Sequence, residues 1–266
     1  MLFIIVFVFV LFFYIHICYH LKKNNETEII HIDYCSNEYV QEICDYRQPV
    51  HFTLHTPESM NKINDSLQLY PQHTLQLHKL IQQSIPINAS LLHSKTDDYV
   101  SYQNDEFLYN TGVIHTVQLL DSYIRPVTSL YSSYDIMFLS ANAYIPFEYN
   151  LSYRTFIRVG KGNVKIKLVP PKCKKYMYPI DSFSSFRFYS PINPWNVQSE
   201  YKTGYEKVES TEIELKSNEI LYIPAYWYYS IQATEKSVLT KHNYWTFMNI
   251  LSVAPSIVLC ALEKQS

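Results

Sequence analysis

The residues that decide the fold are 212–224, which read EIELKSNEILYIP, and the aromatic run AYWYY that follows at 225–229. Apolar and polar side chains alternate before a turn at residues 216–219, and this is the period of half-buried β-strands. Asn218 suits the turn, because Asn adopts the left-handed backbone conformation more readily than most residues. Similar alternation begins near residue 134, so we predict a mainly β fold for residues 131–266.

A second alternating stretch, TFIRVGKGNVKIKLV at residues 155–169, predicts a β-hairpin that turns at Gly160 and Gly162. The alternation places Ile157, Val159, Val164, Ile166 and Leu168 on one apolar face and Arg158, Lys165 and Lys167 on the other. Residues 238–240 and 244–248 predict further strands, and residues 254–263 predict a closing helix.

Residues 24–130 are polar and irregular, and we expect a helical part there. One helix is indicated by Leu67, Leu75, Leu77, Leu80 and Ile81. A second is indicated by Val113, Val117, Leu119 and Leu120, and Pro126 should end it.

The chain begins with the apolar run MLFIIVFVFVLFFYIHIC, which has no charged side chain before Lys22. About 19 helical residues cover roughly 29 Å, close to the hydrocarbon thickness of a bilayer. We therefore predict a single-pass membrane anchor over residues 1–23, with residues 1–21 contacting lipid. A cleaved signal peptide is the alternative. Lys22 and Lys23 favour a cytoplasmic domain, whereas four glycosylation sequons would suit a lumenal one.

The composition excludes several classes of function. The 22 Lys and Arg residues balance 24 Asp and Glu residues, so charge gives no reason to expect nucleic-acid binding. Only 4 glycines are present, and Gly160 and Gly162 match neither the P-loop nor the dinucleotide motif. The histidines are scattered, and no HExxH motif occurs.

Four segments, taken in order, resemble the cupin-like, JmjC-related family of double-stranded β-helix proteins, which includes asparaginyl and histone-type hydroxylases. They are CDYRQPV at residues 44–50, IPFEYN leading to Tyr153 and Arg154 at 145–154, KIKLVPP at 165–171, and LYIPAYWYY at 221–229. The loop SPINPWN at 190–196 also resembles cupin-like proteins of large DNA viruses. The resemblance implies a mainly β fold, a cupin or jelly-roll barrel.

In active relatives two histidines and one carboxylate hold Fe(II) and leave open positions for 2-oxoglutarate and oxygen. The resemblance places Glu148, Asn150 and Tyr229 at these three positions. No histidine occurs between Thr116 and Lys241, so two imidazoles cannot be supplied by the predicted barrel. We therefore expect neither a metal nor a cofactor.

The resemblance places the 2-oxoglutarate site at Thr155 and Val164, with Val164 where relatives carry a lysine. Val164 falls on the apolar face, and a buried dicarboxylate there would lack a charge partner. Arg154 is the one basic residue whose placement could change this expectation, and a surface ion pair is its alternative role. The residues expected to line a pocket are Tyr149, Tyr153, Arg154, Tyr226 and Trp227.

These observations predict a membrane-anchored cupin-like domain that has lost the Fe(II)/2-oxoglutarate site and has a binding or structural role. The alternative is an active 2-oxoglutarate-dependent hydroxylase, acting on a protein or small molecule, with atypical ligands such as Glu148 and Tyr229. A third possibility is a ligand-binding module that uses the tyrosine-rich mouth. The sequence names no protein or small-molecule partner.

Overall fold

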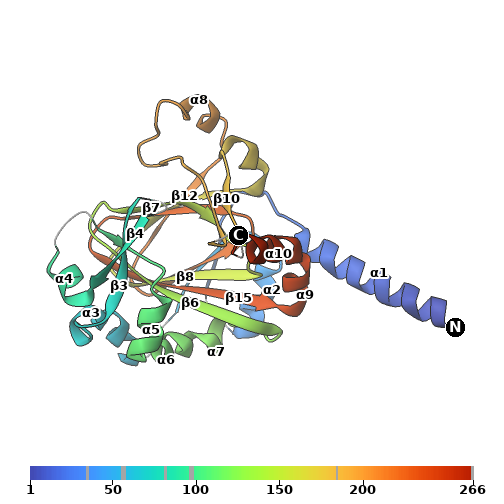
Figure 1. Ribbon diagram of the computed structural model, residues 1–266, viewed down its shortest axis with the longest axis horizontal. Helices are drawn as coiled ribbons and strands as arrows, with labels where there is room; N and C mark the ends of the chain where they lie inside the picture. The colour runs from blue at the N-terminus through green and yellow to red at the C-terminus, as the bar shows by residue number, and fades with distance from the viewer. Residues whose placement is uncertain (34–35, 55–57, 81–82, 96–98, 184, 265–266) are drawn as a thin grey trace.

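The computed structural model describes residues 1–33, 36–54, 58–80, 83–95, 99–183 and 185–264. Within these ranges the chain forms two large β-sheets that face one another, with short helices beneath one sheet and a long helix projecting from the end (Figure 1). The mainly β fold predicted from the alternating sequence is confirmed.

The larger sheet has nine strands among the described residues. In spatial order they are β1 (Ile30–Asp33), β2 (Val50–Thr53), β13 (Glu219–Pro224), β8 (Arg154–Lys161), β15 (Ser237–Thr246), β6 (Ser129–Leu139), β5 (Val100–Ser101), β3 (Thr74–Leu80) and β4 (Gln83–Asn88). Apart from the parallel pair β1 and β2, neighbouring strands run antiparallel.

The second sheet has six described strands, all antiparallel to their neighbours. In spatial order they are β10 (Ile180–Ser182), β11 (Arg187–Tyr189), β7 (Tyr144–Tyr149), β14 (Tyr228–Ala233), β9 (Val164–Val169) and β12 (Thr211–Leu215). The described pairings do not join the two sheets into one closed sheet, so the barrel predicted from the sequence stays a prediction.

Most helices are short and lie outside the sheets. The α-helices are α1 (Leu2–Leu21), α2 (Asn37–Cys44), α3 (Ser66–Leu69), α4 (Ala89–Ser94), α5 (Asp105–Thr111), α6 (Ile114–Val117), α7 (Asp121–Ile124), α8 (Lys202–Tyr205), α9 (Phe247–Ser252) and α10 (Ala254–Glu263). The 3₁₀ helices are η1 (Glu58–Ile63), η2 (Gln118–Leu120) and η3 (Pro171–Tyr176).

The predicted hairpin at residues 155–169 is wrong, although its faces are largely right. Strand β8 pairs with β13 and β15 in the larger sheet, whereas β9 pairs with β12 and β14 in the other sheet. The turn at Gly160 and Gly162 is therefore a crossover between the sheets. Alternation specifies which side chains face the core, but it does not specify which strand is the partner.

The core has layers that follow this arrangement. Between the sheets lies an apolar cluster that includes all five residues predicted to share a face. A second cluster fills the space between the larger sheet and the helices beneath it. Arg158, predicted to face outward, is fully buried on that second side and donates to Asn218 Oδ1 at 2.9 Å, because α-helical segments cover this face too. Asn218 has the expected positive φ of 71°.

The N-terminal part contains more β-structure than the sequence indicated. The helix expected around Leu67–Ile81 is wrong: α3 ends at Leu69, and residues 74–80 form strand β3, while Ile81 lies outside the described residues. Leu75 and Leu77 are buried with intermediate or exposed neighbours, which is period two. The second expected helix is confirmed as α6, η2 and α7, which end before Pro126.

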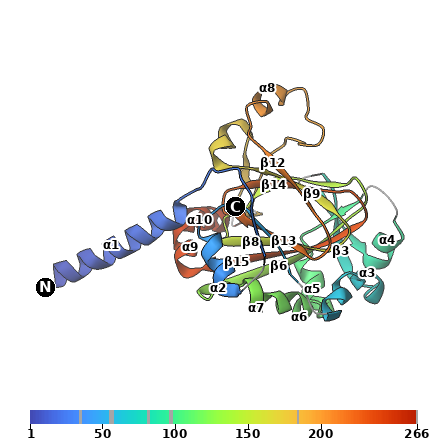
Figure 2. The same ribbon diagram turned by 180° about the vertical axis from the view of Figure 1, so that it is seen from behind.

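Helix α1 projects away from the rest of the chain when viewed from either side (Figures 1 and 2). It has 20 residues, and none of its side chains is buried. Its length and apolar composition suffice to span a membrane, and a signal sequence would meet the same criteria. The predicted C-terminal helix is confirmed as α10.

Candidate functional site

A polar cavity of about 200 Å³ opens between the two sheets. Its wall is built by side chains from β6, β7, β11 and β15 and from the loops beside them. The lining residues are Tyr102, Gln103, Ser133, Glu148, Tyr149, Asn150, Leu151, Ser152, Ser185, Phe186, Arg187, Phe188, Lys241, Asn243 and Trp245.

Strand β15 supplies polar side chains to this cavity because its residues alternate between two buried sides. Leu239 belongs to the core between the sheets, and Lys241 and Asn243 follow it on the same face and line the cavity. His242 lies on the opposite face, where its ring packs edge-on to Tyr134 at 5.5 Å. The only histidine near the expected ligand positions in sequence therefore points away from the cavity.

Three side chains meet at the inner end of the cavity: Glu148, Tyr229 and Lys241, here called the inner cluster. Lys241 Nζ donates to Glu148 Oε1 at 3.0 Å and to the Tyr229 hydroxyl oxygen at 3.3 Å. The Tyr229 hydroxyl donates in turn to Glu148 Oε1. Glu148 and Lys241 are 14% and 13% exposed, so this is a largely buried ion pair.

The charges of the inner cluster stabilise one another. Burial alone would lower the pKa of Lys241, but Glu148, Tyr229 and Asp135 together outweigh burial and raise it. Burial would likewise raise the pKa of Glu148, yet Lys241 and Arg187 hold that pKa below its ordinary value. Burial raises the pKa of the Tyr229 phenol, which therefore stays protonated at neutral pH. The cluster thus holds an ammonium, a carboxylate and a neutral phenol.

A second cation, Arg187 on β11, lies beside the inner cluster. Its Nη2 atom donates to the Tyr102 hydroxyl at 2.8 Å and lies 3.9 Å from Glu148 Oε2. Behind Lys241, the carboxylate of Asp135 accepts backbone N–H groups of Gln103 and Asn104 at 2.9 and 2.7 Å. The inner end of the cavity is therefore charged but internally compensated.

Amide and hydroxyl groups continue the network toward the larger sheet. Asn150 Nδ2 donates to the Tyr229 hydroxyl and to Thr155 Oγ1, both at 3.2 Å. Thr155 Oγ1 donates to Asn243 Oδ1 at 2.9 Å. The structure thus brings together the three residues at predicted metal positions and one of the two at predicted co-substrate positions. Val164, the other, is fully buried in the apolar core between the sheets.

The residues expected to line a pocket are spread over several places. Tyr149 lines the cavity, and its hydroxyl donates to Asp181 at 3.0 Å. Trp227 is buried in the core between the sheets. Tyr226 lies under the Lys23 ammonium, 4.5 Å from its ring centre.

Tyr153 and Arg154 lie on the other side of the larger sheet, against α2. Arg154 Nη2 is 2.5 Å from Asp45 Oδ1, and the Tyr153 hydroxyl donates to the same oxygen at 3.0 Å. The Arg154 side chain is only 3% exposed, whereas the Asp45 side chain is 49% exposed. Arg154 therefore forms an ion pair outside the cavity. Its alternative role was an ion pair at the surface, but the Arg154 side chain is buried.

Sequence reasoning missed Lys241 and Arg187. It named Arg154 as the one basic residue whose placement could change the expectation at the co-substrate positions, whereas two other cations, Lys241 and Arg187, reach the cavity. Lys241 carries a usable signal: it lies two residues after the apolar Leu239, just beyond the strand predicted at residues 238–240, so continued alternation would place both on one face. Arg187 lies in a short strand with no such signal.

The donor set does not fit a ferrous ion. Iron sites of this kind need two neutral imidazoles and a carboxylate on one face. Glu148 supplies a carboxylate, but Asn150 and Tyr229 supply an amide and a protonated phenol, and the Lys241 ammonium binds the carboxylate oxygen that a metal would need. Among the described residues, no three His, Cys, Asp or Glu side chains are clustered so as to hold a metal ion.

Comparison with known proteins gives one positive result. No curated protein matches the chain. The family model described as a cupin-like domain, which is of the JmjC type, matches residues 23–250, and this range contains both sheets and the whole cavity. The match covers most of the chain, and the protein therefore belongs to the family of cupin-like domains.

Proposed function

We propose that this protein is a membrane-anchored cupin-like binding domain that has lost Fe(II)- and 2-oxoglutarate-dependent oxygenase chemistry. The observation that carries the proposal is the position of the Lys241 ammonium, which binds Glu148 and Tyr229 at the place where the family would hold its metal. Among the described residues that line the cavity, Glu148 supplies the one carboxylate, and the Lys241 ammonium lies 3.0 Å from its Oε1 atom. A divalent cation bound to that carboxylate would lie close to this positive charge, and like charges at such a distance repel strongly.

We further propose that the two facing sheets are the halves of a double-stranded β-helix. Family membership and the apolar core between the sheets support this architecture. The four sequence segments support a common origin with hydroxylases of the asparaginyl type, and the loop at residues 190–196 supports a likeness to cupin-like proteins of large DNA viruses.

The cavity supports a role in binding a small polar molecule. It offers amide groups from Asn150 and Asn243, hydroxyl groups from Ser133 and Ser152, and aromatic walls from Trp245 and its neighbours. A site with convergent polar groups in an aromatic frame is typical of small-molecule binding. Its volume of about 200 Å³ favours a ligand smaller than most cofactors.

The alternative is an active hydroxylase that uses Glu148 and Tyr229 as atypical ligands. It requires the Lys241 ammonium to leave Glu148 or to lose its proton, and the raised pKa of Lys241 opposes proton loss. We therefore prefer the binding role.

The test uses the full chain purified in detergent. Incubation with Fe(II), ascorbate and 2-oxoglutarate should release no more CO₂ than buffer does. Release of CO₂ that requires the protein and disappears in Glu148→Ala would establish the alternative.

Binding is tested by thermal unfolding of the same sample with amino acids, sugars and small carboxylates. A ligand of the cavity should raise Tm progressively with its concentration, and Asn243→Leu should abolish that rise. A rise that survives in Asn243→Leu would place the binding elsewhere and refute the role of the cavity.

The anchoring proposal concerns α1 and its orientation. We propose that α1 stays in the mature protein and spans the membrane, with the domain on the cytoplasmic side, supported by Lys22 and Lys23 at its C-terminal end. Protease protection on intact membranes tests the orientation: digestion of the domain from the lumenal side would refute it.

A further inference from the structure

Helix α10 buries none of its side chains in the apolar core of the domain. None of its ten residues is buried, and the helix contains no charged side chain before Glu263. Val258, Leu259 and Leu262 are 56%, 44% and 58% exposed and lie at i, i+1 and i+4, which is one helical face. A helix face that contacts only water normally carries polar side chains, so this exposed apolar face marks a site of interaction.

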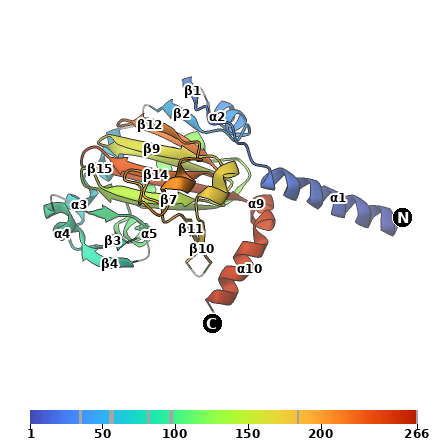
Figure 3. The ribbon, with the colours of Figure 1, turned by 90° about the horizontal axis from the view of Figure 1, so that it is seen from above.

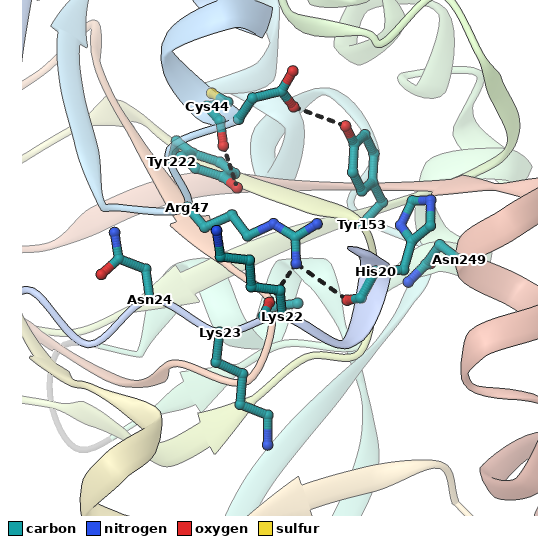
Figure 4. Close-up of a pocket in the computed structure, with 11 residues that line it drawn as sticks. His20, Lys22, Lys23, Asn24, Cys44, Arg47, Tyr153, Tyr222 and Asn249 are labelled. Atoms are coloured by element: carbon teal, nitrogen blue, oxygen red, sulfur yellow. Dashed lines mark hydrogen bonds between the residues drawn. The ribbon is translucent and has the colours of Figure 1, made fainter. Parts of the chain in front are cut away.

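Helix α1 is held against the domain by Arg47. The guanidinium Nη1 atom donates to the His20 carbonyl oxygen at 3.3 Å and also to the Lys22 carbonyl oxygen, as Figure 4 shows. The same guanidinium lies over the Tyr19 ring, 4.5 Å from its centre. A cation bound to the last carbonyl groups of a helix stabilises that helix end. The position of α1 relative to the other helices is therefore fixed by specific contacts.

Helix α9 places apolar side chains beside the last turns of α1. An open groove of about 540 Å³ is lined by Ile15 and Tyr19 of α1 and by Phe247 of α9. Phe247 is 53% exposed. From α9 the chain continues into α10, which runs across the direction of α1 (Figure 3). When α1 stands upright in a bilayer, α10 consequently lies along the bilayer surface.

The loop before β6 adds to this apolar end of the domain. Thr128 lines the same groove, and its neighbours Val127 and Leu130 are 94% and 63% exposed. Exposed apolar residues of this loop therefore flank a residue that lines the same groove as Phe247.

We propose that α10 and Phe247 enter the interface of the membrane that α1 spans, so that the domain rests on the bilayer. This inference rests on the proposed anchoring by α1. Ile15 precedes Lys22 by seven residues, or roughly 10 Å along the helix, and Phe247 shares a groove with Ile15. When Lys22 lies at the membrane surface, Phe247 reaches about the depth of 5–10 Å at which interfacial helices bury their apolar faces. The position of α1 therefore places the exposed apolar side chains of α9 and α10 against lipid.

The experiment places one spin label at a time on the full chain, in vesicles of phosphatidylcholine and phosphatidylglycerol. Cys18, Cys35 and Cys260 are first replaced by serine, and the buried Cys44 and Cys173 are retained. The labels are introduced by Leu259→Cys on α10, by Val8→Cys in the middle of α1, and by Glu235→Cys. Glu235 is exposed in the turn between β14 and β15, at the opposite end of β15 from α9. Each label is tested for collision with oxygen, which concentrates in lipid, and with a nickel chelate, which stays in water.

The ratio of oxygen to nickel collisions at Leu259 should exceed the ratio at Glu235 several-fold and stay below the ratio at Val8, because an interfacial helix lies less deep than the middle of α1. A label at Leu259 that behaves like the one at Glu235, while Val8 is in lipid, would overturn the inference and leave the anchoring intact. A label at Leu259 shielded from both reagents would also overturn it, because another protein copy would then cover α10. A label at Val8 in water would refute the anchoring proposal, and the inference with it.

Discussion

The substitution Lys241→Met tests the inner cluster most sharply. Methionine keeps an unbranched side chain but removes the ammonium that donates to Glu148 Oε1 at 3.0 Å. Removing one partner of a buried ion pair costs roughly 3–5 kcal/mol, because the remaining charge is left uncompensated. Arg187 still lies 3.9 Å from the other carboxylate oxygen, so we expect the lower end of that range, about 3 kcal/mol. In a domain of this size that corresponds to a fall in Tm of about 6–12 °C.

The loss should depend on pH and on Glu148. Without the ammonium, burial should raise the pKa of Glu148 above its value in the unfolded chain, so the variant should become more stable relative to wild type as the pH falls. The double variant Lys241→Met/Glu148→Gln removes both charges and should recover most of the loss. The Tm of the wild type, of Lys241→Met and of the double variant is measured by thermal unfolding in detergent, followed by tryptophan fluorescence. If Lys241→Met lowered the free energy of unfolding by less than about 1 kcal/mol, the pair would behave like an exposed ion pair, and its burial would be refuted.

Three further substitutions, with Gly112→Ala as a control, test the inner cluster, the face of β15 opposite the cavity, and the crossover between the sheets. Tyr229→Phe removes a hydroxyl that donates to the carboxylate of the inner cluster, and it should lower the free energy of unfolding by about 1.5–3 kcal/mol; an unchanged urea midpoint would contradict this. Burial lowers the pKa of His242 to about 3, so stability should fall as the pH drops below about 6.5, by up to about 1.4 kcal/mol per unit. His242→Gln should show a shallower decline between pH 4.5 and 7, and an identical slope would refute the assignment. Gly162→Ala should lower the free energy of unfolding more than Gly112→Ala does in denaturant titrations. Both glycines have positive φ, but only at Gly162 would the new Cβ lie 2.4 Å from another atom. Equal losses of stability in the two variants would contradict this crossover geometry.

The sequence predicted the strands and their faces better than it predicted their partners. Ile157, Val159 and Val164 occupy the core face that the alternation assigned to them. The crossover at Gly160 and Gly162 could not be distinguished from a hairpin, because both need a tight turn between two alternating stretches. The sequence leaves β3 ambiguous, because Leu77 and Leu80 are three residues apart, as on one helical face, whereas Leu75 and Leu77 are two apart, which is the strand period that the structure shows.

The candidate site was predicted in part. Residue-by-residue matching to the cupin-like family selects Glu148, Asn150 and Tyr229, and in the structure the Tyr229 hydroxyl is hydrogen-bonded to both of the others. This matching does not point to Lys241, because lysine is normally a surface residue and its pairing with Glu148 joins residues 93 positions apart. The burial of Arg158 was missed for a related reason: alternation marks one apolar face, but it does not reveal that helices cover the other.

The most direct measurement of the central claim is anaerobic calorimetric titration of Fe(II) into the full chain in detergent. With the Lys241 ammonium bound to Glu148, no saturable uptake of one equivalent should occur, and Lys241→Met should be the variant in which weak uptake first becomes detectable. Tight binding of one Fe(II) per wild-type chain, abolished by Glu148→Ala, would contradict the proposed loss of the metal site.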